Sequence, residues 1–344
     1  MTKTPAQPAR RTPTLEDVAK AAGVSRATAS RVVNDVGTVD PALRLRVHDA
    51  IAATGYVPNS AARTLVNRRT GTVALVMSGS DGSAEQVFAD PFFGRITGGV
   101  VTCLRDRGMR ATMLLADSDK ARRDALDTAR RESDGALLVS THPNDPLPQL
   151  FVEAGVPAVL FARPSSMLPI SFVDVGHDVG GALAADRLAD RGCRRIATIA
   201  GPADLPAAID RLAGFERALQ RRGIPYVHVA RGNFTAESGE QAMTELLAQA
   251  PDLDGVFAAN DLMAVGALRV LRDAGRAVPD DVALIGFDDS QPARLTRPRL
   301  TTISQPVEAM AAHMTTILLT HLTTPETPPT SVVFDPHLVP RETA

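Results

Sequence analysis

Two arginines stand close together in a segment whose apolar spacing predicts a pair of short helices, from Thr14 to Asn34. On the second predicted helix, Arg26, Ala27 and Arg31 are expected to face outward, away from the first helix. Arginine can donate two hydrogen bonds to a guanine edge, and alanine can contact a thymine methyl group. These side chains therefore suit the major groove of DNA. A structural helical hairpin with a charged face is the alternative interpretation.

The helices that must position these side chains have recognisable ends. Thr14 and Ser25 are residue types that cap helix N-termini, and each precedes an apolar run of helical spacing. Gly23 lies between the two helices, where it can adopt the positive φ of a tight turn. A third helix is predicted between Asp40 and Gly55. The three helices together form a unit of the helix-turn-helix type.

The charge of the chain is divided unevenly along its length. Residues 1–70 carry 11 Lys and Arg against 5 Asp and Glu, whereas the remaining residues carry 26 against 34. A basic segment beside an acidic one suggests that the basic part meets a polyanion, because each cation placed on a phosphate releases a counterion. Charge alone also fits a solvated N-terminal region.

Length and motif content restrict the class of protein. A chain of 344 residues predicts two or three packed units. No run of 18 apolar residues occurs, and the polar start lacks the centre of a signal peptide, so we expect a soluble cytoplasmic protein. The two cysteines are far apart, and His313 and His321 lack a third ligand nearby, which argues against a metal site. No nucleophile, metalloprotease or phosphate-loop motif occurs, so neither an enzyme nor a cofactor is expected.

The rest of the chain alternates short apolar runs with segments of helical spacing, which predicts two doubly wound α/β units in tandem. Ligands bind such sheets beyond the carboxyl ends of the strands, so two facing lobes make a natural cleft. Asn260 and Asp288 each follow a predicted strand of the second unit. Buried parallel strands are predicted over residues 72–77, 111–117, 135–140, 157–162, 195–201, 226–231, 255–260 and 282–289.

Seven motifs, in a fixed order, make the chain similar to a known family. They are TLEDVAKAAGVSRATASRVVN from Thr14, YVPNSAARTL from Tyr56, DPFF from Asp90, RLAGF from Arg211, ANDLMAVGAL from Ala259, VPDDVALIGFDD from Val278 and LTTISQP from Leu300. With them the chain resembles the lactose-repressor (LacI/GalR) family of bacterial transcription regulators. The resemblance implies a three-helix head and a hinge helix, followed by a two-lobed core like that of periplasmic binding proteins. It also implies a DNA-binding regulator, a repressor, controlled by a small effector.

By position, the resemblance assigns DNA contacts to the head and the hinge. Base edges would be contacted by Arg26, Ala27 and Arg31. Phosphates would be contacted or positioned by Thr14, Ser25, Thr28, Ser30 and Asn34. The hinge would enter the minor groove through Asn59, Ala62 and Leu65, with Leu65 as a wedge between base steps. A plain linker is the alternative for this last segment.

The same resemblance assigns a small-effector site to the cleft. Its residues would be Asp90, Phe93, Arg211, Phe234, Asn260 and Asp288. An arginine fork and carboxylates match the hydroxyls of a sugar, and aromatic faces match its C–H side. Ala162 and Val175 stand where many relatives have aspartate, so fewer acceptors are expected. A nucleobase or another metabolite therefore stays an alternative to a sugar.

The domain map follows from these assignments. We expect a disordered basic arm over residues 1–13, the DNA-binding head over 14–57, the hinge and linker over 58–70 and the core over 71–340. The first lobe would hold about 71–173 and 305–330, and the second about 174–303 and 331–339. The expected partners are a near-palindromic operator in double-stranded DNA, the effector and a second copy of the chain, without a membrane. A corepressor-dependent regulator and a solute-binding protein without DNA function are the alternatives.

Overall fold

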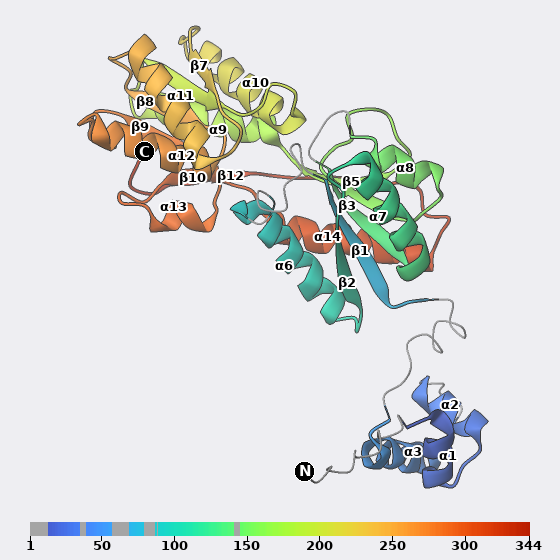
Figure 1. Ribbon diagram of the computed structural model, residues 1–344. Helices are drawn as coiled ribbons and strands as arrows, with labels where there is room; N and C mark the ends of the chain where they lie inside the picture. The colour runs from blue at the N-terminus through green and yellow to red at the C-terminus, as the bar shows by residue number, and fades with distance from the viewer. Residues whose placement is uncertain (1–12, 35–38, 57–68, 79–86, 88, 141–144) are drawn as a thin grey trace, which may run out of the picture. The chain divides into compact units, whose positions relative to one another are not determined.

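A computed structural model describes residues 13–34, 39–56, 69–78, 87, 89–140 and 145–344, and Figure 1 shows the path of the chain. The chain divides into two compact units, residues 1–70 and 71–344. Residues 1–12 of the predicted arm and the predicted hinge residues Asn59, Ala62 and Leu65 lie outside the described residues.

The described part of the first unit contains the helices α1 (Leu15–Ala22), α2 (Arg26–Val33) and α3 (Pro41–Thr54). Thr14 forms a capping box at the start of α1, and Gly23 ends this helix with a φ of +62°. The side chains of Val18, Val32 and Val47 are almost fully buried in one cluster that holds the helices together. The three predicted helices are confirmed, with bounds close to those expected.

The second unit begins with a six-stranded parallel sheet in the order β11-β5-β4-β3-β1-β2. Its strands are β1 (Thr72–Ser78), β2 (Arg110–Leu115), β3 (Gly135–Ser140), β4 (Ala158–Phe161), β5 (Ser171–Val175) and β11 (Ser331–Phe334). The helices packed on it are α6 (Pro91–Arg105), α7 (Asp119–Glu132), α8 (Leu147–Glu153) and α14 (Val307–Thr323). These elements form the first lobe.

The second lobe contains another six-stranded sheet, in the order β12-β10-β9-β8-β6-β7. Its strands are β6 (Ile196–Ala200), β7 (His228–Arg231), β8 (Gly255–Ala258), β9 (Ala283–Asp288), β10 (Thr301–Ser304) and β12 (His337–Val339). All pairings are parallel except that of β12 with β10. The helices are α9 (His177–Asp190), α10 (Pro206–Arg221), α11 (Ala236–Gln249), α12 (Asp261–Asp273) and α13 (Gln291–Leu295). The predicted fold of two doubly wound sheets is confirmed.

The chain passes between the two sheets three times, after β5, β10 and β11. One predicted boundary is wrong, because residues 331–339 do not all join the second lobe. β11 pairs with β5 of the first sheet, with Val332 opposite Val173, and only β12 reaches the second sheet. Pro336 lies between the two short strands and cannot donate to a sheet ladder, so the run is divided there.

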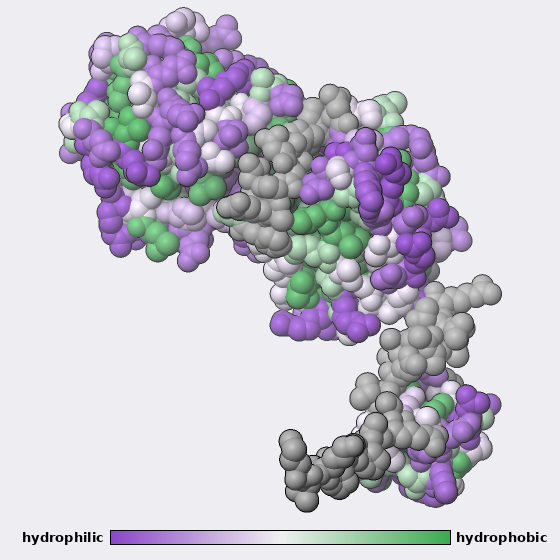
Figure 2. All heavy atoms as spheres, viewed as in Figure 1, coloured by the Kyte–Doolittle hydropathy of each residue, from purple (hydrophilic) through white to green (hydrophobic). Residues whose placement is uncertain are grey.

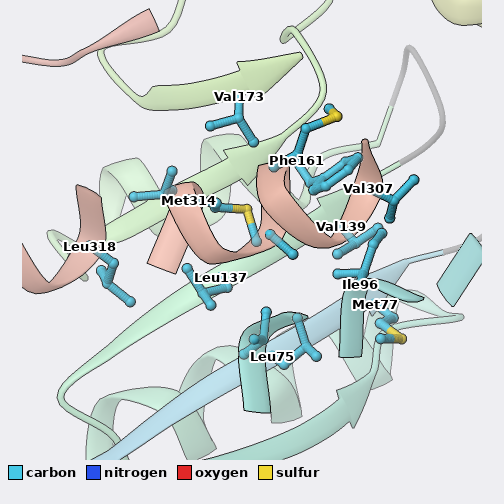
Figure 3. Close-up of a cluster of buried hydrophobic side chains, with 14 of the residues drawn as sticks. Leu75, Met77, Ile96, Leu137, Val139, Phe161, Val173, Val307, Met314 and Leu318 are labelled. Carbon is cyan, nitrogen blue, oxygen red and sulfur yellow. The ribbon is translucent and has the colours of Figure 1, made fainter. Parts of the chain in front are cut away.

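Successive residues of the central strands face opposite sides of the first sheet. Leu75 and Leu137 belong to a buried cluster with residues of α6 and α14, while Val76 and Leu138 belong to a second cluster with residues of α7 and α8. Figure 3 shows the first cluster, in which Met314 of α14 lies against the strands. Burial on both faces explains why these strands are continuously apolar in sequence.

Two predicted strands form but are not fully buried. β2 is the edge of the first sheet, and Met113 keeps 36% of its surface exposed there. β7 is the edge of the second sheet and is only partly buried. The expectation of buried strands is wrong at these two edges, because apolar content alone does not distinguish an edge strand from a central one.

Candidate functional site

The second helix of the head presents an exposed polar face. Arg26, Ala27 and Arg31 are exposed on α2, whereas Ala29 and Val32 are buried beneath it. Arg26 keeps 72% of its side chain exposed. The buried and exposed sides of the helix are those that its sequence predicts, so both arginines are exposed, and Arg26 Nε lies 4.0 Å from the exposed Glu16 Oε1.

Hydroxyl and amide side chains form hydrogen bonds at and near the helix ends of the head. Ser25 Oγ accepts from the backbone N–H of Thr28 at 3.1 Å and lies 2.9 Å from the Thr28 hydroxyl. Asn34 Nδ2 donates to Ser30 Oγ at 3.3 Å, and Thr14 Oγ1 donates to a carboxylate one turn later at 2.8 Å. Each of the five residues keeps part of its surface accessible. These hydrogen bonds are therefore compatible with a contact to a partner.

A residue that the sequence analysis missed fastens the turn between α1 and α2. Arg46 of α3 donates from Nη2 to the carbonyl oxygen of Ala22 at 2.6 Å. A cation at this place satisfies a carbonyl that the end of α1 leaves unpaired, and it faces the negative end of the helix dipole. No local pattern could indicate this contact, because the two residues lie 24 positions apart.

A cavity of about 1120 Å³ lies in the second unit and is lined by residues of both lobes. Its lining includes all six residues that the family resemblance assigns to an effector: Asp90, Phe93, Arg211, Phe234, Asn260 and Asp288. The first two stand at the start of α6, in the first lobe. The other four come from α10, the start of α11, the start of α12 and the end of β9, in the second lobe.

Arg211 is buried in the cavity wall, with 5% of its surface exposed. Its Nη1 donates to the carbonyl oxygen of Ala259 at 2.5 Å. Its Nη2 donates to Gln305 Oε1 at 3.3 Å and lies 3.5 Å from Asp288 Oδ1. The ring of Phe287 lies against the guanidinium, whose carbon is 3.6 Å from the ring centroid. An arginine held this firmly can bind ligand oxygens with little further loss of side-chain freedom.

Two lining residues that the sequence analysis missed complete this network. Arg211 Nε donates to Nδ1 of His177 at 3.2 Å, and His177 Nε2 lies 3.4 Å from Asp174 Oδ1. Burial lowers the pKa of His177 below its usual value, and the charge of Arg211 lowers it further. Burial alone would raise the pKa of Asp174, but hydrogen bonds from His177 and from backbone N–H groups bring it below its usual value. A neutral histidine thus links the arginine to an ionised carboxylate.

Asp288 ends β9 in a strained conformation. Its φ is +107°, a value that few residues other than glycine adopt. Asp261 fixes the loop that follows, since its Oδ2 accepts from the backbone N–H and the hydroxyl of Ser290 at 2.7 and 2.8 Å. Burial raises the pKa of Asp288, as do the carboxylates of Asp261 and Asp90, against the opposing charge of Arg211. Strain and a perturbed pKa at one residue are typical of a binding site.

Asn260, Phe234 and Asp90 hold the backbone at the cavity wall. Asn260 caps α12 by accepting from the backbone N–H of Met263 at 2.9 Å, and its Nδ2 donates to the carbonyl oxygen of Phe234 at 2.9 Å. Phe234 has a φ of +69°, so the second contact supports a strained turn. Asp90 accepts from the backbone N–H of Phe92 at 2.9 Å, and burial raises the pKa of Asp90. Each polar side chain keeps hydrogen-bonding capacity for a ligand.

The cavity contains more carboxylates than the sequence analysis expected. Ala162 and Val175 stand in the lining without polar side chains, as expected, but other segments contribute carboxylates. The additional aspartates are Asp145, Asp174, Asp204 and Asp210. Arg163 of the first lobe donates from Nη2 to Asp210 Oδ2 of the second lobe at 2.6 Å. These carboxylates lie outside the family motifs, and several already have partners in the protein: Asp145 accepts from Arg122, Asp174 lies 3.4 Å from His177 Nε2, and Asp210 accepts from Arg163.

Within the ranges that the structure describes, no helix combines the length and apolar character needed to cross a bilayer. Among the same residues, His, Cys, Asp and Glu do not form a group of three or more that could hold a metal ion. His313 packs against Phe334, and His321 Nε2 lies 2.8 Å from the hydroxyl of Ser171.

Comparisons with known proteins cover both units. Residues 14–59 match the family described as bacterial regulatory proteins, lacI family, and residues 185–344 match the periplasmic binding protein-like domain. The HTH-type transcriptional regulator CelR of Thermobifida fusca is 47% identical over 97% of this chain and 98% of its own. A transcriptional regulator CelR-cellobiose complex has a TM-score of 0.75 at 44% identity, over 96% of this chain and 100% of that one. The lac repressor dimer bound to operator and the anti-inducer ONPF has a TM-score of 0.83 at 28% identity, over 97% and 99%.

Proposed function

Since this chain belongs to the LacI family of bacterial regulatory proteins, we infer that it is a transcriptional repressor whose affinity for operator DNA is controlled by a sugar. It is a DNA-binding regulator and not an enzyme. The observation that carries the effector part is the pair of Arg211, which is buried, and Asp288, whose side chain is 15% exposed, in a cavity between two lobes. We place its action in the cytoplasm, where a bacterial operator is accessible.

The head supplies the DNA-binding part of the proposal. Arg26 and Arg31 on the exposed face of α2 would donate to guanine edges, and Ala27 would contact a thymine methyl group. Phosphates would be contacted or positioned by Thr14, Ser25, Thr28, Ser30 and Asn34. The hinge residues Asn59, Ala62 and Leu65 would add contacts in the minor groove.

The effector that we propose is a disaccharide of the cellobiose type. The cavity, of about 1120 Å³, exceeds the roughly 300–1,000 Å³ of common small-ligand pockets, which gives room for two sugar rings. Arg211 and Asp288 would bind hydroxyls, while Phe93 and Phe234 would cover the C–H faces of the rings. The CelR structure is a complex with cellobiose, and its chain is 44% identical to this one.

A homodimer would let two heads bind a near-palindromic operator. Large apolar side chains are exposed on both lobes, with Val101 on α6 at 43%, Met113 on β2 at 36% and Leu295 on α13 at 68%. Figure 2 shows hydrophobic atoms at the surface of the first lobe among hydrophilic ones. A second copy would cover such a surface. The lac repressor with the same fold is a dimer on its operator.

The test is a pull-down of fragmented genomic DNA by the purified full-length protein, with and without cellobiose. We expect enrichment of one short near-palindrome that cellobiose releases. Recovery only in the presence of cellobiose would show a corepressor response instead. Failure to enrich any sequence, in a preparation that binds cellobiose, would contradict the proposed repressor.

Two arginines of α10 provide a matched pair of variants for this experiment. Arg211→Met should bind the same palindrome but no longer respond to cellobiose, because it lacks the fork beside Asp288. Arg217→Met should behave like the parent, since Arg217 is 57% exposed and pairs with Asp178 outside the cavity. An unchanged cellobiose response in Arg211→Met would contradict the assigned effector site.

A further inference from the structure

Arg95 of α6 extends from the first lobe and contacts residues beyond it. Its side chain is 19% exposed, and its Nη1 donates to the backbone carbonyl oxygen of Asp288, in the second lobe, at 2.7 Å. Its Nη2 donates to the backbone carbonyl oxygen of Gln305 at 3.0 Å, where the chain returns to α14. Arginine side chains are mostly exposed, so a largely buried arginine that donates to two backbone carbonyl groups is unusual.

Glu308 of α14 fixes the orientation of this guanidinium. Its carboxylate accepts from Arg95 Nε at 2.7 Å and from Arg95 Nη2 at 2.8 Å, in a two-point contact. Arg95 and Glu308 both belong to the first lobe, so their ion pair does not itself join the lobes. It directs the remaining donors of Arg95 at the main chain of Asp288 and Gln305.

The two backbone acceptors of Arg95 belong to residues that Arg211 also contacts. Arg211 Nη2 lies 3.5 Å from Asp288 Oδ1 and donates to Gln305 Oε1 at 3.3 Å. Asp288 and Gln305 are thus held twice, through the main chain by Arg95 and through the side chains by Arg211. Both residues line the cavity, whereas Arg95 stands behind the lining. Arg95 can therefore influence a ligand only through the residues that it holds.

The main chain at Asp288 depends on such support. Its φ of +107° is followed by a φ of +49° at Asp289, and both values are uncommon for residues with a side chain. Conformations of this kind persist where surrounding contacts determine them. Asp261 holds the loop after Asp288 through the backbone N–H of Ser290, and Arg95 holds the carbonyl oxygen of Asp288 itself.

We propose that Arg95 is a positioning residue of the effector site, which holds the strained main chain of Asp288 and thereby directs the Asp288 carboxylate into the cavity. The proposal rests on the proposed function, because it takes Asp288 to contact the effector. It also makes effector affinity depend on the arrangement of the lobes, since Arg95 and Asp288 belong to different ones. A change of lobe angle that separates Arg95 from Asp288 would free the carboxylate and weaken ligand binding.

The first test compares cellobiose binding by full-length variants in isothermal titration calorimetry. Arg95→Met removes the donors and keeps much of the side-chain length, and we expect about tenfold weaker binding, as for the loss of one charge-assisted hydrogen bond. Arg95→Lys should recover part of the affinity, because an ammonium can reach one carbonyl oxygen but lacks the planar fork. Thermal unfolding of each variant shows that it is folded.

A matched control comes from the surface of the second lobe. Arg222 also contacts two acceptors, Asp186 at 2.9 Å and Asp190 at 2.8 Å, and it lies outside the cavity lining. Arg222→Met should bind cellobiose like the parent. A loss equal to that of Arg95→Met would show a general effect of removing a paired arginine and would overturn the proposal.

A double-mutant cycle separates positioning from a general structural role. Asp288→Asn keeps the size of the side chain and tolerates a positive φ, but it replaces the carboxyl group with an amide. In that background Arg95→Met should weaken cellobiose binding less than about twofold, because the carboxylate that Arg95 directs is gone. An equal tenfold loss in both backgrounds, or no loss in the parent, overturns the proposal.

Amide hydrogen exchange tests the same point without any sugar. In Arg95→Met, peptides that cover residues 286–291 should exchange faster, while those of α11 keep their protection. Unchanged exchange at 286–291 overturns the positioning role. A parent protein that binds none of a panel of monosaccharides and disaccharides would overturn the proposed function, and the exchange result would still decide the role of Arg95.

Discussion

Arg211 Nε donates a hydrogen bond to Nδ1 of His177 at 3.2 Å, and both side chains are buried. The bond requires an unprotonated Nδ1, so the proton of the neutral imidazole resides on Nε2, 3.4 Å from Asp174 Oδ1. Protonation of Nδ1 would remove the acceptor and place two cations side by side. The placement of Arg211 therefore depends on the protonation state of a histidine.

We predict that, because of His177, the protein becomes less stable as the pH is lowered below about 6.5, the usual pKa of histidine. Above that pH the imidazole is neutral in both the folded and the unfolded chain. Below it the unfolded chain takes up a proton that the folded chain does not, because burial and Arg211 lower the pKa of His177 in the fold. The loss continues until the pH reaches the lowered pKa. The other charged groups that act on the imidazole are Asp174 and Asp210, which favour the proton.

His177→Gln tests this prediction, since glutamine can accept from Arg211 and donate to Asp174 but does not titrate. Urea unfolding between about pH 5 and 7.5 should show a smaller loss of stability in His177→Gln than in the parent. The raised pKa values of Asp288 and Asp261 have the opposite effect, because they make the folded protein more stable as the pH falls. Both aspartates are present in the parent and in His177→Gln, so they do not account for a difference between the two proteins. Equal pH dependence in the two proteins would refute the role given to His177.

Part of the cavity can be predicted from apolar runs and the residues that end them. Residues 255–260 and 282–289 are continuously apolar until they reach Asn260 and Asp288, so the carboxyl-end rule alone predicts that these two side chains meet in one cleft. The same rule would have found His177, which lies two positions after the last residue of β5. β5 escaped prediction as an apolar run because Asp174 interrupts it. A carboxylate within a strand thus breaks the apolar run by which the strand would be predicted.

Contacts between distant segments lie beyond sequence reasoning. Arg95 and Asp288 are 193 positions apart, and Arg95 reads as an ordinary charged residue of a helix. Arg95 is buried because the two lobes meet there, and no local sequence pattern predicts that meeting. The pairing of β11 with the first sheet could not be predicted either. Its four residues alternate in burial like those of any short edge strand, and this pattern does not show which sheet the strand joins.

Arg31→Ala and Arg46→Ala should separate DNA recognition from folding of the head. Arg31 is exposed on α2, so Arg31→Ala should weaken operator binding by about 1–3 kcal/mol and leave the melting of the head unchanged. Arg46 holds the carbonyl oxygen of Ala22, so Arg46→Ala should destabilise the head by about 1 kcal/mol. Electrophoretic mobility shifts and thermal unfolding measure the two effects. Operator affinity of Arg31→Ala equal to that of the parent would show that α2 is misassigned.

Leu295→Asp should dissociate the proposed homodimer. Leu295 is 68% exposed on α13, and a carboxylate buried there by a second copy would lack a partner. Sedimentation velocity should show a monomer, and operator affinity should fall because one head binds only a half-site. Met167→Asp is the control, since Met167 is fully exposed and lies outside the helices and strands of both lobes. A dimer in both variants would exclude the α13 surface as the interface.

Close packing of α9 on α10 brings His177 and Arg211 together, and two glycines permit it. A Cβ at Gly181 of α9 would lie far inside van der Waals contact with the carbonyl oxygen of Arg211, and one at Gly214 of α10 would meet that of Asp178 in the same way. The backbones of the two helices therefore approach more closely than any side chain allows. Arg211 and His177 meet at the start of this crossing.

Gly181→Ala should push the two helices apart, with two consequences. Overpacking should lower the free energy of unfolding by about 3 kcal/mol, and the stretched Arg211 to His177 contact should weaken cellobiose binding. Gly94→Ala is the matched control: Gly94 is an exposed residue of α6 with no atom near its missing Cβ, so the alanine should stabilise the helix by roughly 0.5–1 kcal/mol. Urea unfolding should therefore show opposite changes of stability in the two variants, and calorimetry should show weaker cellobiose binding in Gly181→Ala alone. A Gly181→Ala protein as stable as the parent would mean that α9 and α10 can separate without a loss of stability. It would contradict the claim that their close packing holds His177 against Arg211.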